Sequence, residues 1–163
     1  MINYQPFAGI VTAINDFSIG QYNETGCYKL MSVDNGYGNT VNFVVAPTTY
    51  FVDQEVLSVG DQVTGFYDAN APAPLIFPPQ FNALIMCKNT SGQFVKVDHF
   101  DDQLVSSDHT LQLTMNPATK VVLKNGQPFT GNLSNRDLLI VYGATTRSIP
   151  AQTTPYQIVV LCS

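Results

Sequence analysis

The densest cluster of ionisable side chains has the residue types of a metal site. It is Asp98-His99-Phe100-Asp101-Asp102, followed closely by Asp108-His109. Imidazole and carboxylate groups are common ligands of transition metals. The alternative is a strand end and a turn whose polar side chains face water. When the chain is aligned on the internal repeat described below, His99 falls at the position of Ala13 and His109 falls in a turn. We therefore expect the water-facing arrangement, with no metal and no other cofactor.

Other catalytic arrangements lack the residues that they need. A Ser-His-Asp mechanism requires a serine on a strained turn such as Gly-x-Ser-x-Gly, and the sequence has none. The two glutamates, Glu24 and Glu55, fall in expected loops, which gives no carboxylate pair for glycoside hydrolysis. The segment Gly36-Tyr37-Gly38 lacks the following Lys and Ser or Thr of a phosphate-binding loop. We therefore expect no enzymatic activity and no catalytic residues.

The composition favours a surface that approaches other copies of itself. Only 12% of the 163 residues are charged, about half the usual ~25%, and the net charge is -5. With so few cations the surface repels phosphate groups, so we expect neither a nucleic-acid partner nor insertion into or attachment to a membrane. Residues 1–6 also lack the features of a secretory signal. A weakly charged surface suits a coat, a fibre or a lattice.

The chain contains two copies of one β-rich unit, which we interpret as an internal duplication. The block from Tyr67 to Cys87 matches the block from Tyr142 to Cys162 at a constant offset of 75 residues, without a gap. The last strand of each half and the loop before it lie in this block. The predicted domains are residues 1–88 and residues 89–163.

Two further blocks precede this one in each half, in the same order. Residues 43–49 match residues 113–119 at an offset of 70, and residues 9–14 resemble residues 95–100 at an offset of 86. The changes of offset place insertions in turn-like stretches, such as residues 20–26 of the first half. Loops tolerate such changes of length and strands do not.

Each unit is predicted to be a small all-β barrel. In the first half, runs rich in Val, Ile, Phe, Tyr and Thr predict five strands. These lie at residues 7–14, 28–34, 40–45, 62–67 and 82–87. Five strands with a long connection between the third and the fourth suit a Greek-key, OB-like barrel, which also hides its sheet edges. A sandwich built from both halves is the alternative.

The most informative loop is Pro72-Ala73-Pro74-Leu75-Ile76-Phe77-Pro78-Pro79. Proline holds it extended and keeps it out of a sheet. Either Leu75, Ile76 and Phe77 cap the open end of their own barrel, or they form an exposed patch that docks a neighbouring subunit. The equivalent loop, residues 146–155, is mostly polar. If one loop is a plug and the other a receptor, head-to-tail contacts propagate as a fibre or a sheet.

The candidate subunit-interface residues come from both loops and from the N-terminal arm, which could add to the edge of a neighbour's sheet. They are Leu75, Ile76, Phe77, Ile2, Tyr4, Arg147 and Ile149.

The three cysteines, Cys27, Cys87 and Cys162, form no Cys-x-x-Cys pair, so a zinc site is not expected. Cys87 and Cys162 end strands that the repeat makes equivalent. Each of the three is a candidate for an intermolecular disulfide, which would lock an assembly in an oxidising setting. The alternative for each is a buried thiol.

The end of the chain resembles a known type of repeat. Asn135-Arg136-Asp137-Leu138-Leu139-Ile140-Val141-Tyr142, followed by the loop at residues 146–155, is similar to a β-rich repeat of uncharacterised cell-surface and spore-associated proteins from Gram-positive spore-formers. The similarity lies mainly in residues 135–161. It implies an envelope or spore-surface location and brings no catalytic residues.

These features predict a non-catalytic, self-assembling subunit of a spore- or cell-surface fibre or coat. Its partners would be copies of itself in a head-to-tail homopolymer, together with other surface or coat proteins. Lysis of the mother cell would release such a protein without a signal sequence. The alternative is a glycan- or peptide-binding β module that uses one face of a barrel.

Overall fold

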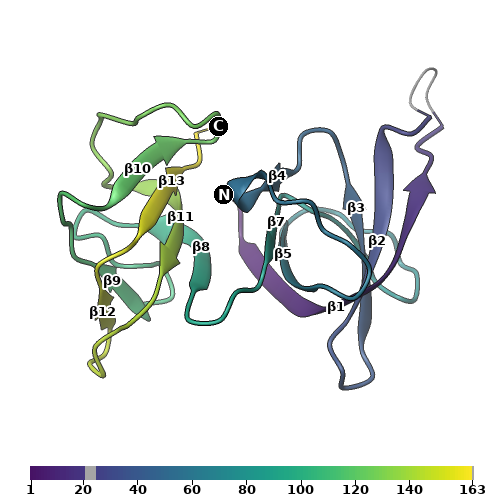
Figure 1. The fold of residues 1–163 in the computed structure, drawn as a ribbon, viewed down its shortest axis with the longest axis horizontal. Helices are drawn as coiled ribbons and strands as arrows, with labels where there is room; N and C mark the ends of the chain where they lie inside the picture. The colour runs from purple at the N-terminus through teal and green to yellow at the C-terminus, as the bar shows by residue number, and fades with distance from the viewer. Residues whose placement is uncertain (21–24, 163) are drawn as a thin grey trace. The chain divides into compact units, whose positions relative to one another are not determined.

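The computed structural model describes residues 1–20 and 25–162, and it divides into two compact units, Met1–Asn89 and Thr90–Ser163 (Figure 1). Among the described residues, 47% lie in strands. The helical content of this part is a single 3-10 turn, η1, at Val52–Gln54. The prediction of an all-β protein is confirmed. Of the predicted insertion at residues 20–26, residues 21–24 lie outside the described part.

The first unit forms one sheet of seven strands in the order β4-β7-β5-β1-β2-β3-β6. Its strands are β1 (Tyr4–Phe17), β2 (Tyr28–Asp34), β3 (Thr40–Val45), β4 (Tyr50–Phe51), β5 (Gln62–Asp68), β6 (Gln80–Asn82) and β7 (Ile85–Lys88). Strand β1 is long enough to take two partners. Its first half pairs with β5 and its second half pairs with β2, and the change occurs at Ile10.

The second unit repeats this pairing pattern with fewer strands. Its strands are β8 (Phe94–Phe100), β9 (Leu111–Leu113), β10 (Lys120–Leu123), β11 (Arg136–Tyr142), β12 (Ala151–Thr153) and β13 (Gln157–Val160). The four-stranded order β10-β13-β11-β8 corresponds to β4-β7-β5-β1 of the first unit. The parallel pair β9–β12 likewise corresponds to the parallel pair β3–β6.

The prediction of two closed Greek-key, OB-like barrels is wrong. The first sheet ends at β4 and β6, and no ladder joins these two strands in the described residues. The strands are instead those of a β-solenoid of about three turns. The reason lies in the short parallel pairs β3–β6, β4–β7, β9–β12 and β10–β13, which contain strands of two to four residues. Strands this short end a sheet and do not carry a ladder around a barrel.

The hydrogen-bonded register relates β7 to β13 at an offset of 72 residues, where the sequence repeat predicted 75. Thr64 of β5 pairs with Cys87, and the equivalent Leu139 of β11 pairs with Val159. Val159 is therefore the counterpart of Cys87. Cys162 lies beyond the end of β13, so the two cysteines do not end equivalent strands.

A second contact gives the same offset. The Thr49 hydroxyl donates to the Ala83 carbonyl oxygen at 2.8 Å. The Thr119 hydroxyl donates to the Pro155 carbonyl oxygen at 2.7 Å. Ala83 and Pro155 are 72 residues apart, as the strand pairing requires.

The first strand of each unit also shifts by three residues against its predicted alignment. Ile10 pairs with Gln62, and His99 pairs with Asp137, which is the equivalent of Gln62 in β11. His99 thus occupies the position of Ile10 and not that of Ala13.

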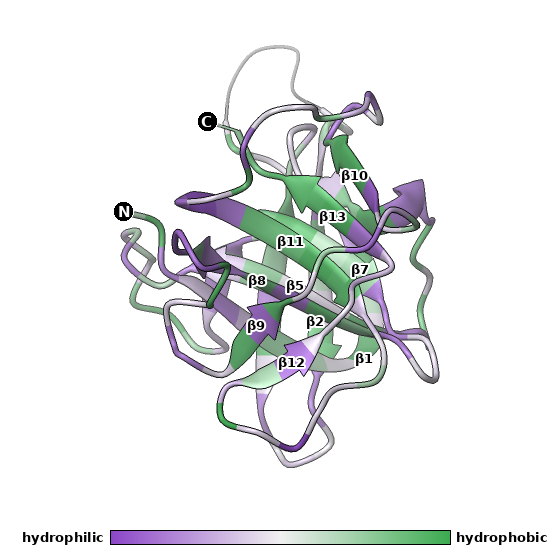
Figure 2. Cartoon of the chain, turned by 90° about the vertical axis from the view of Figure 1, so that its left-hand side faces the viewer, coloured by the Kyte–Doolittle hydropathy of each residue, from purple (hydrophilic) through white to green (hydrophobic). Residues whose placement is uncertain are grey.

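Each unit has an apolar core of its own. In the first, Val11, Val33, Phe43, Val63 and Met86 have no more than traces of exposed surface. In the second, Ile158, Val159 and Val160 of β13 are buried on both faces of the strand, as the uninterrupted apolar run predicted. Figure 2 shows β11 and β13 as the most continuously hydrophobic strands of this unit.

Candidate functional site

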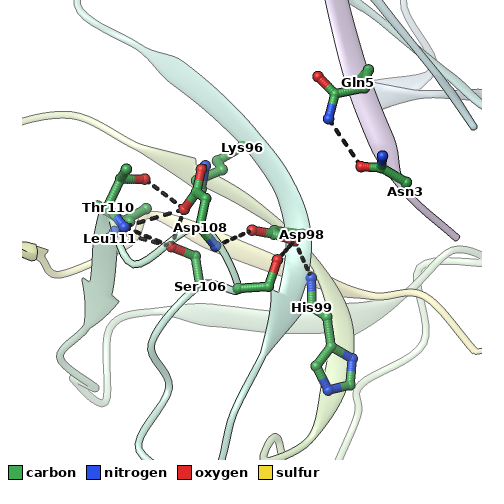
Figure 3. Close-up of polar contacts among 10 residues, drawn as sticks. Asn3, Gln5, Lys96, Asp98, His99, Ser106, Asp108, Thr110 and Leu111 are labelled. Carbon is green, nitrogen blue, oxygen red and sulfur yellow. Dashed lines mark hydrogen bonds and ion pairs between the residues drawn. The ribbon is translucent and has the colours of Figure 1, made fainter. Parts of the chain in front are cut away.

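The acidic cluster predicted from the sequence forms a hydrogen-bond network between β8 and the turn before β9 (Figure 3). The Asp98 carboxylate accepts a hydrogen bond from the Ser107 hydroxyl at 2.5 Å and another from the His99 backbone N–H at 2.8 Å. Its second oxygen accepts the Asp108 backbone N–H at 3.4 Å. The carboxylate of Asp98 is thus turned toward donors of the chain itself.

Asp108 is the centre of the network. Its carboxylate accepts hydrogen bonds from Lys96 at 2.6 Å, from the Ser106 hydroxyl at 2.7 Å and from the Thr110 hydroxyl at 2.7 Å. Partial burial raises the pKa of Asp108, but the hydrogen bonds from Lys96, Ser106 and Thr110 outweigh that effect and hold the pKa well below its usual range. The carboxylate is therefore charged at neutral pH and fully occupied.

The network explains how a serine is accommodated in the core. Ser106 bridges to Phe100 as Val33 pairs with Val11 in the first unit. It is only 1% exposed, and a buried hydroxyl without partners is costly. Its oxygen donates to Asp108 and accepts a backbone N–H of β9 at 3.0 Å. This arrangement stabilises the fold and leaves no group aimed at a ligand.

The two histidines do not join this network as metal ligands. His99 Nδ1 lies 2.9 Å from a carboxylate oxygen of Asp137, and His109 has a φ of 61° in the turn before β9. The Ser107 hydroxyl donates to Asp98, so it is not aligned with the His99–Asp137 pair as a nucleophile would be. Across residues 1–20 and 25–162, no group of three or more His, Cys, Asp or Glu side chains could hold a metal ion.

The apolar loop between β5 and β6 lies in solvent. The exposed fractions of Leu75, Ile76 and Phe77 are 104%, 52% and 91%. Of the two interpretations of this loop, a cap on its own unit therefore fails within the chain, because a cap would bury these side chains. The peptide bond between Phe77 and Pro78 is cis.

The corresponding loop of the second unit is less different than its sequence suggests. With the offset of 72, Ile149 falls at the position of Phe77, and its side chain is 95% exposed. Each of these residues precedes a proline in a cis peptide bond. Arg147 is exposed in the same loop. The contrast between an apolar and a polar loop is therefore wrong at this position: both loops present a large apolar side chain to solvent.

The N-terminal arm belongs largely to its own sheet. Tyr4 begins β1 and pairs with Asp68 of β5, and the Asn3 backbone N–H donates to the Asp68 carboxylate at 3.0 Å. Ile2, which precedes the strand, is 40% exposed. From Tyr4 onward the arm is therefore not available as a free strand for a neighbour's sheet.

The three cysteines differ in exposure, and no disulfide joins them in the described part of the chain. Cys87 is 4% exposed, and burial raises the pKa of its thiol to about 11. As a candidate for an intermolecular disulfide Cys87 is therefore wrong, because the thiolate that would react is neither accessible nor formed at neutral pH. Cys27 and Cys162 are both exposed.

We expect thiol labelling to follow this pattern. Cys27 and Cys162 should react with iodoacetamide in the native protein, while Cys87 should react only after unfolding. Peptide mass spectrometry after timed labelling measures each rate separately. Labelling of Cys87 at the rate of Cys162 in native protein would contradict the burial of β7.

Two equivalent cavities lie beside these loops, and the sequence did not indicate either. The cavity of the first unit, of about 160 Å³, is lined by Tyr67, Asp68, Ala71, Pro72, Ala73, Pro74, Gln80, Phe81, Asn82 and Leu84. That of the second unit, of about 440 Å³, is lined by Thr114, Gly143, Ala144, Thr145, Thr146, Gln152, Thr153, Thr154 and Tyr156. The two threonine pairs, at 145–146 and 153–154, are the signal that could have marked the second cavity.

Comparison with known proteins adds no family to these observations. No family model, no curated protein and no solved structure matches the chain. In the part of the chain that the structure describes, no helix is both long and apolar enough to cross a membrane.

Proposed function

We propose that this chain is a non-catalytic structural subunit that associates with further copies of itself at a spore or cell surface. The observation that carries the proposal is the exposure of Leu75 and Phe77, with Ile149 at the position equivalent to Phe77. Exposed apolar side chains gathered in one loop are typical of a surface that contacts a partner. The location follows the resemblance of residues 135–161 to surface-protein repeats.

Proline prepares the first loop for such a contact. Pro72, Pro74, Pro78 and Pro79 restrict the backbone on both sides of the apolar residues. A segment that is already restricted loses less conformational entropy when it docks. The loop therefore offers its apolar surface at a lower entropic cost than a flexible segment of the same composition.

The magnitudes favour assembly through more than one contact. Full burial of a Leu or a Phe side chain stabilises an interface by roughly 1.5–3 kcal/mol. Association costs about 4–15 kcal/mol in lost translational and rotational freedom. One loop alone would thus give a weak complex. A subunit with an apolar loop in each unit is bivalent, and bivalent subunits form chains or closed rings.

The loop is tested by replacing its three apolar side chains with serine in L75S/I76S/F77S. We expect wild-type protein to form oligomers with rising concentration, and the variant to need at least a tenfold higher concentration. Sedimentation velocity over a concentration series, with and without reductant, measures this. Thermal stability should be nearly unchanged, because these side chains do not contact the core.

The matched control is Val56→Ser. Val56 is 84% exposed in the segment between η1 and β5, so it tests for a general effect of removing apolar surface. This variant should assemble as the wild type does. A wild-type protein that stays monomeric at the highest concentration under both conditions would refute the proposal. So would equal weakening by Val56→Ser.

A further inference from the structure

The cavity of the second unit has the shape and the position of a ligand site. It lies between the segment that follows β11 and strand β12, with Tyr156 at its side. Its volume of about 440 Å³ is within the range of roughly 300–1,000 Å³ that is usual for small-molecule sites. It is open to solvent along one side, so part of a longer chain can enter it.

The lining of this cavity is polar and uncharged. Five threonines, Gln152 and Tyr156 line it together with Gly143 and Ala144, and no ionisable acid or base is present other than the tyrosine phenol. Charged ligands would find no counter-ion there. A purely apolar ligand would strip water from the hydroxyl groups without replacing their hydrogen bonds. The lining therefore suits a neutral ligand rich in hydroxyl groups.

Some of these groups build the cavity and others remain available. The Thr153 hydroxyl donates to the Ala144 carbonyl oxygen at 2.8 Å, and the Thr146 hydroxyl accepts the Gln152 backbone N–H at 2.9 Å. These bonds hold the two walls together. The side chains of Thr114, Thr145, Gln152 and Thr154 make no hydrogen bond to other described residues. A hydroxyl both donates and accepts, as does the amide of glutamine, which matches the hydroxyl groups of a sugar.

Tyr156 supplies a flat apolar face beside these polar groups. Its ring packs against the backbone of Gly143: a Cβ placed on Gly143 would lie 2.3 Å from the Tyr156 hydroxyl oxygen and 2.9 Å from Cζ. The glycine therefore allows the ring to lie where it does, and the side chain remains 54% exposed. Tyrosine combines an apolar ring with a polar end, and sugars likewise have apolar C–H faces between polar edges.

The first unit shows that the backbone alone does not dictate this lining. Its equivalent cavity is smaller, of about 160 Å³. Tyr67 and Phe81 stack beside it with ring centroids 3.9 Å apart. It is lined partly by proline and by the carboxylate residue Asp68. At the position of Tyr156 it has Leu84, and at that of Thr154 it has Asn82.

We propose that the cavity of the second unit is a binding site for a neutral saccharide, with Tyr156 as the stacking platform and Gln152, Thr145 and Thr154 as hydrogen-bonding groups. This goes beyond self-association. It does not require Leu75 or Phe77, and it fails or holds independently of them. Because the site is open, we expect an affinity of about 1 mM for a single oligosaccharide chain.

The test is a titration of the full chain with cellohexaose, chitohexaose, maltohexaose and xylohexaose, with hexagalacturonate as the charged comparison. Chemical shifts in ¹H–¹⁵N spectra report binding, at a protein concentration where sedimentation shows a single species. We expect at least one neutral oligosaccharide to shift the amides of Gly143, Ala144 and residues 152–156, and hexagalacturonate to bind at least tenfold more weakly.

Two variants and one matched control locate the site. Tyr156→Leu introduces the residue that the first unit has at this position, and Gln152→Ala removes the amide. Each should weaken binding at least tenfold for the first and severalfold for the second, with unchanged folded spectra elsewhere. Gln80→Ala removes the equivalent amide of the first unit and should leave binding unchanged. Absence of binding by all four neutral oligosaccharides, or binding that survives Tyr156→Leu, would overturn the proposal.

Discussion

Gly9→Ala is expected to destabilise the first unit by about 1–3 kcal/mol or more, which is the usual cost of forcing an extra methyl group into a packed site. A Cβ on Gly9 would lie 2.2 Å from the Asp34 carbonyl oxygen, 2.6 Å from the Asp34 carbonyl carbon and 3.0 Å from the Asn35 Cα. All three atoms are backbone. No side chain can turn aside to relieve the overlap.

The backbone cannot move away cheaply either. Gly9 pairs with Val63 of β5, and the next residue, Ile10, pairs with both Gln62 of β5 and Asp34 of β2. This is the point at which β1 passes from one partner strand to the other. Separating β1 from Asp34 therefore breaks the pairing that holds β2 and β3 onto the rest of the sheet.

The measurement is urea unfolding of wild type, Gly9→Ala and the control Gly131→Ala. The control adds the same methyl group at another glycine, where its closest neighbour is the Phe129 ring at 2.8 Å. A ring that is only partly buried can turn aside, so we expect an effect below that of Gly9→Ala. Hydrogen exchange read by mass spectrometry should place the loss of protection in residues 4–45. Equal destabilisation by the two variants would contradict the argument.

The strands themselves could be predicted from the residues. The predicted spans at residues 28–34 and 40–45 agree with β2 and β3. Both segments alternate apolar with polar side chains, which is the pattern of a half-buried strand, and Asn35-Gly36 marks the turn between them. Where local residue types decide the structure, the sequence alone was sufficient.

The register of the repeat could not be predicted, and the physical reason is visible in β7 and β13. Both strands are buried on both faces, with Ile85, Met86 and Cys87 in one and Ile158 and Val159 in the other. A strand that is apolar at every position has no alternation to fix its alignment. The terminal cysteines then favoured an offset of 75, whereas the hydrogen bonds require 72. A shift by an odd number of residues exchanges the two faces of a strand, so the error also reversed which side chains were compared.

The candidate sites divide in the same way. The exposure of Phe77 follows from its proline-rich surroundings, which the sequence displays. The equivalence of Ile149 to Phe77 and the cavity beside Tyr156 depend on the correct register and on segments brought together by pairing. The acidic cluster around Asp108 has the composition of a site, but its carboxylates are consumed by donors within the chain. Composition alone cannot separate these cases.

Asp108→Ala is expected to destabilise the second unit by roughly 1–3 kcal/mol at neutral pH, the cost of leaving a buried polar group without its partner. The variant deprives the Ser106 hydroxyl, which is 1% exposed, of its acceptor. It also removes the acceptor of Lys96 and Thr110. Asp102→Ala is the control, because this residue is exposed and its carboxylate accepts no hydrogen bond from the described residues. Thermal unfolding of the three proteins gives the comparison.

The pH dependence separates this mechanism from simple loss of packing. The pKa of Asp108 is lowered in the folded state relative to about 3.9 in the unfolded chain. The unfolded state therefore binds more protons in acid, so the stabilisation is present above pH ~4 and is lost as the pH falls further toward the folded pKa. Because the Asp108 side chain is 48% exposed, solvent screens part of this effect. Asp108→Ala should consequently lose less stability than wild type between pH 5 and pH 2, on the order of half the slope or less in the second unit. A residual slope remains, since the Val105 and Gln103 backbone N–H groups also lower the pKa of Asp101. If the variant kept the full wild-type slope, the charged network around Asp108 would not be what holds the turn before β9 in place.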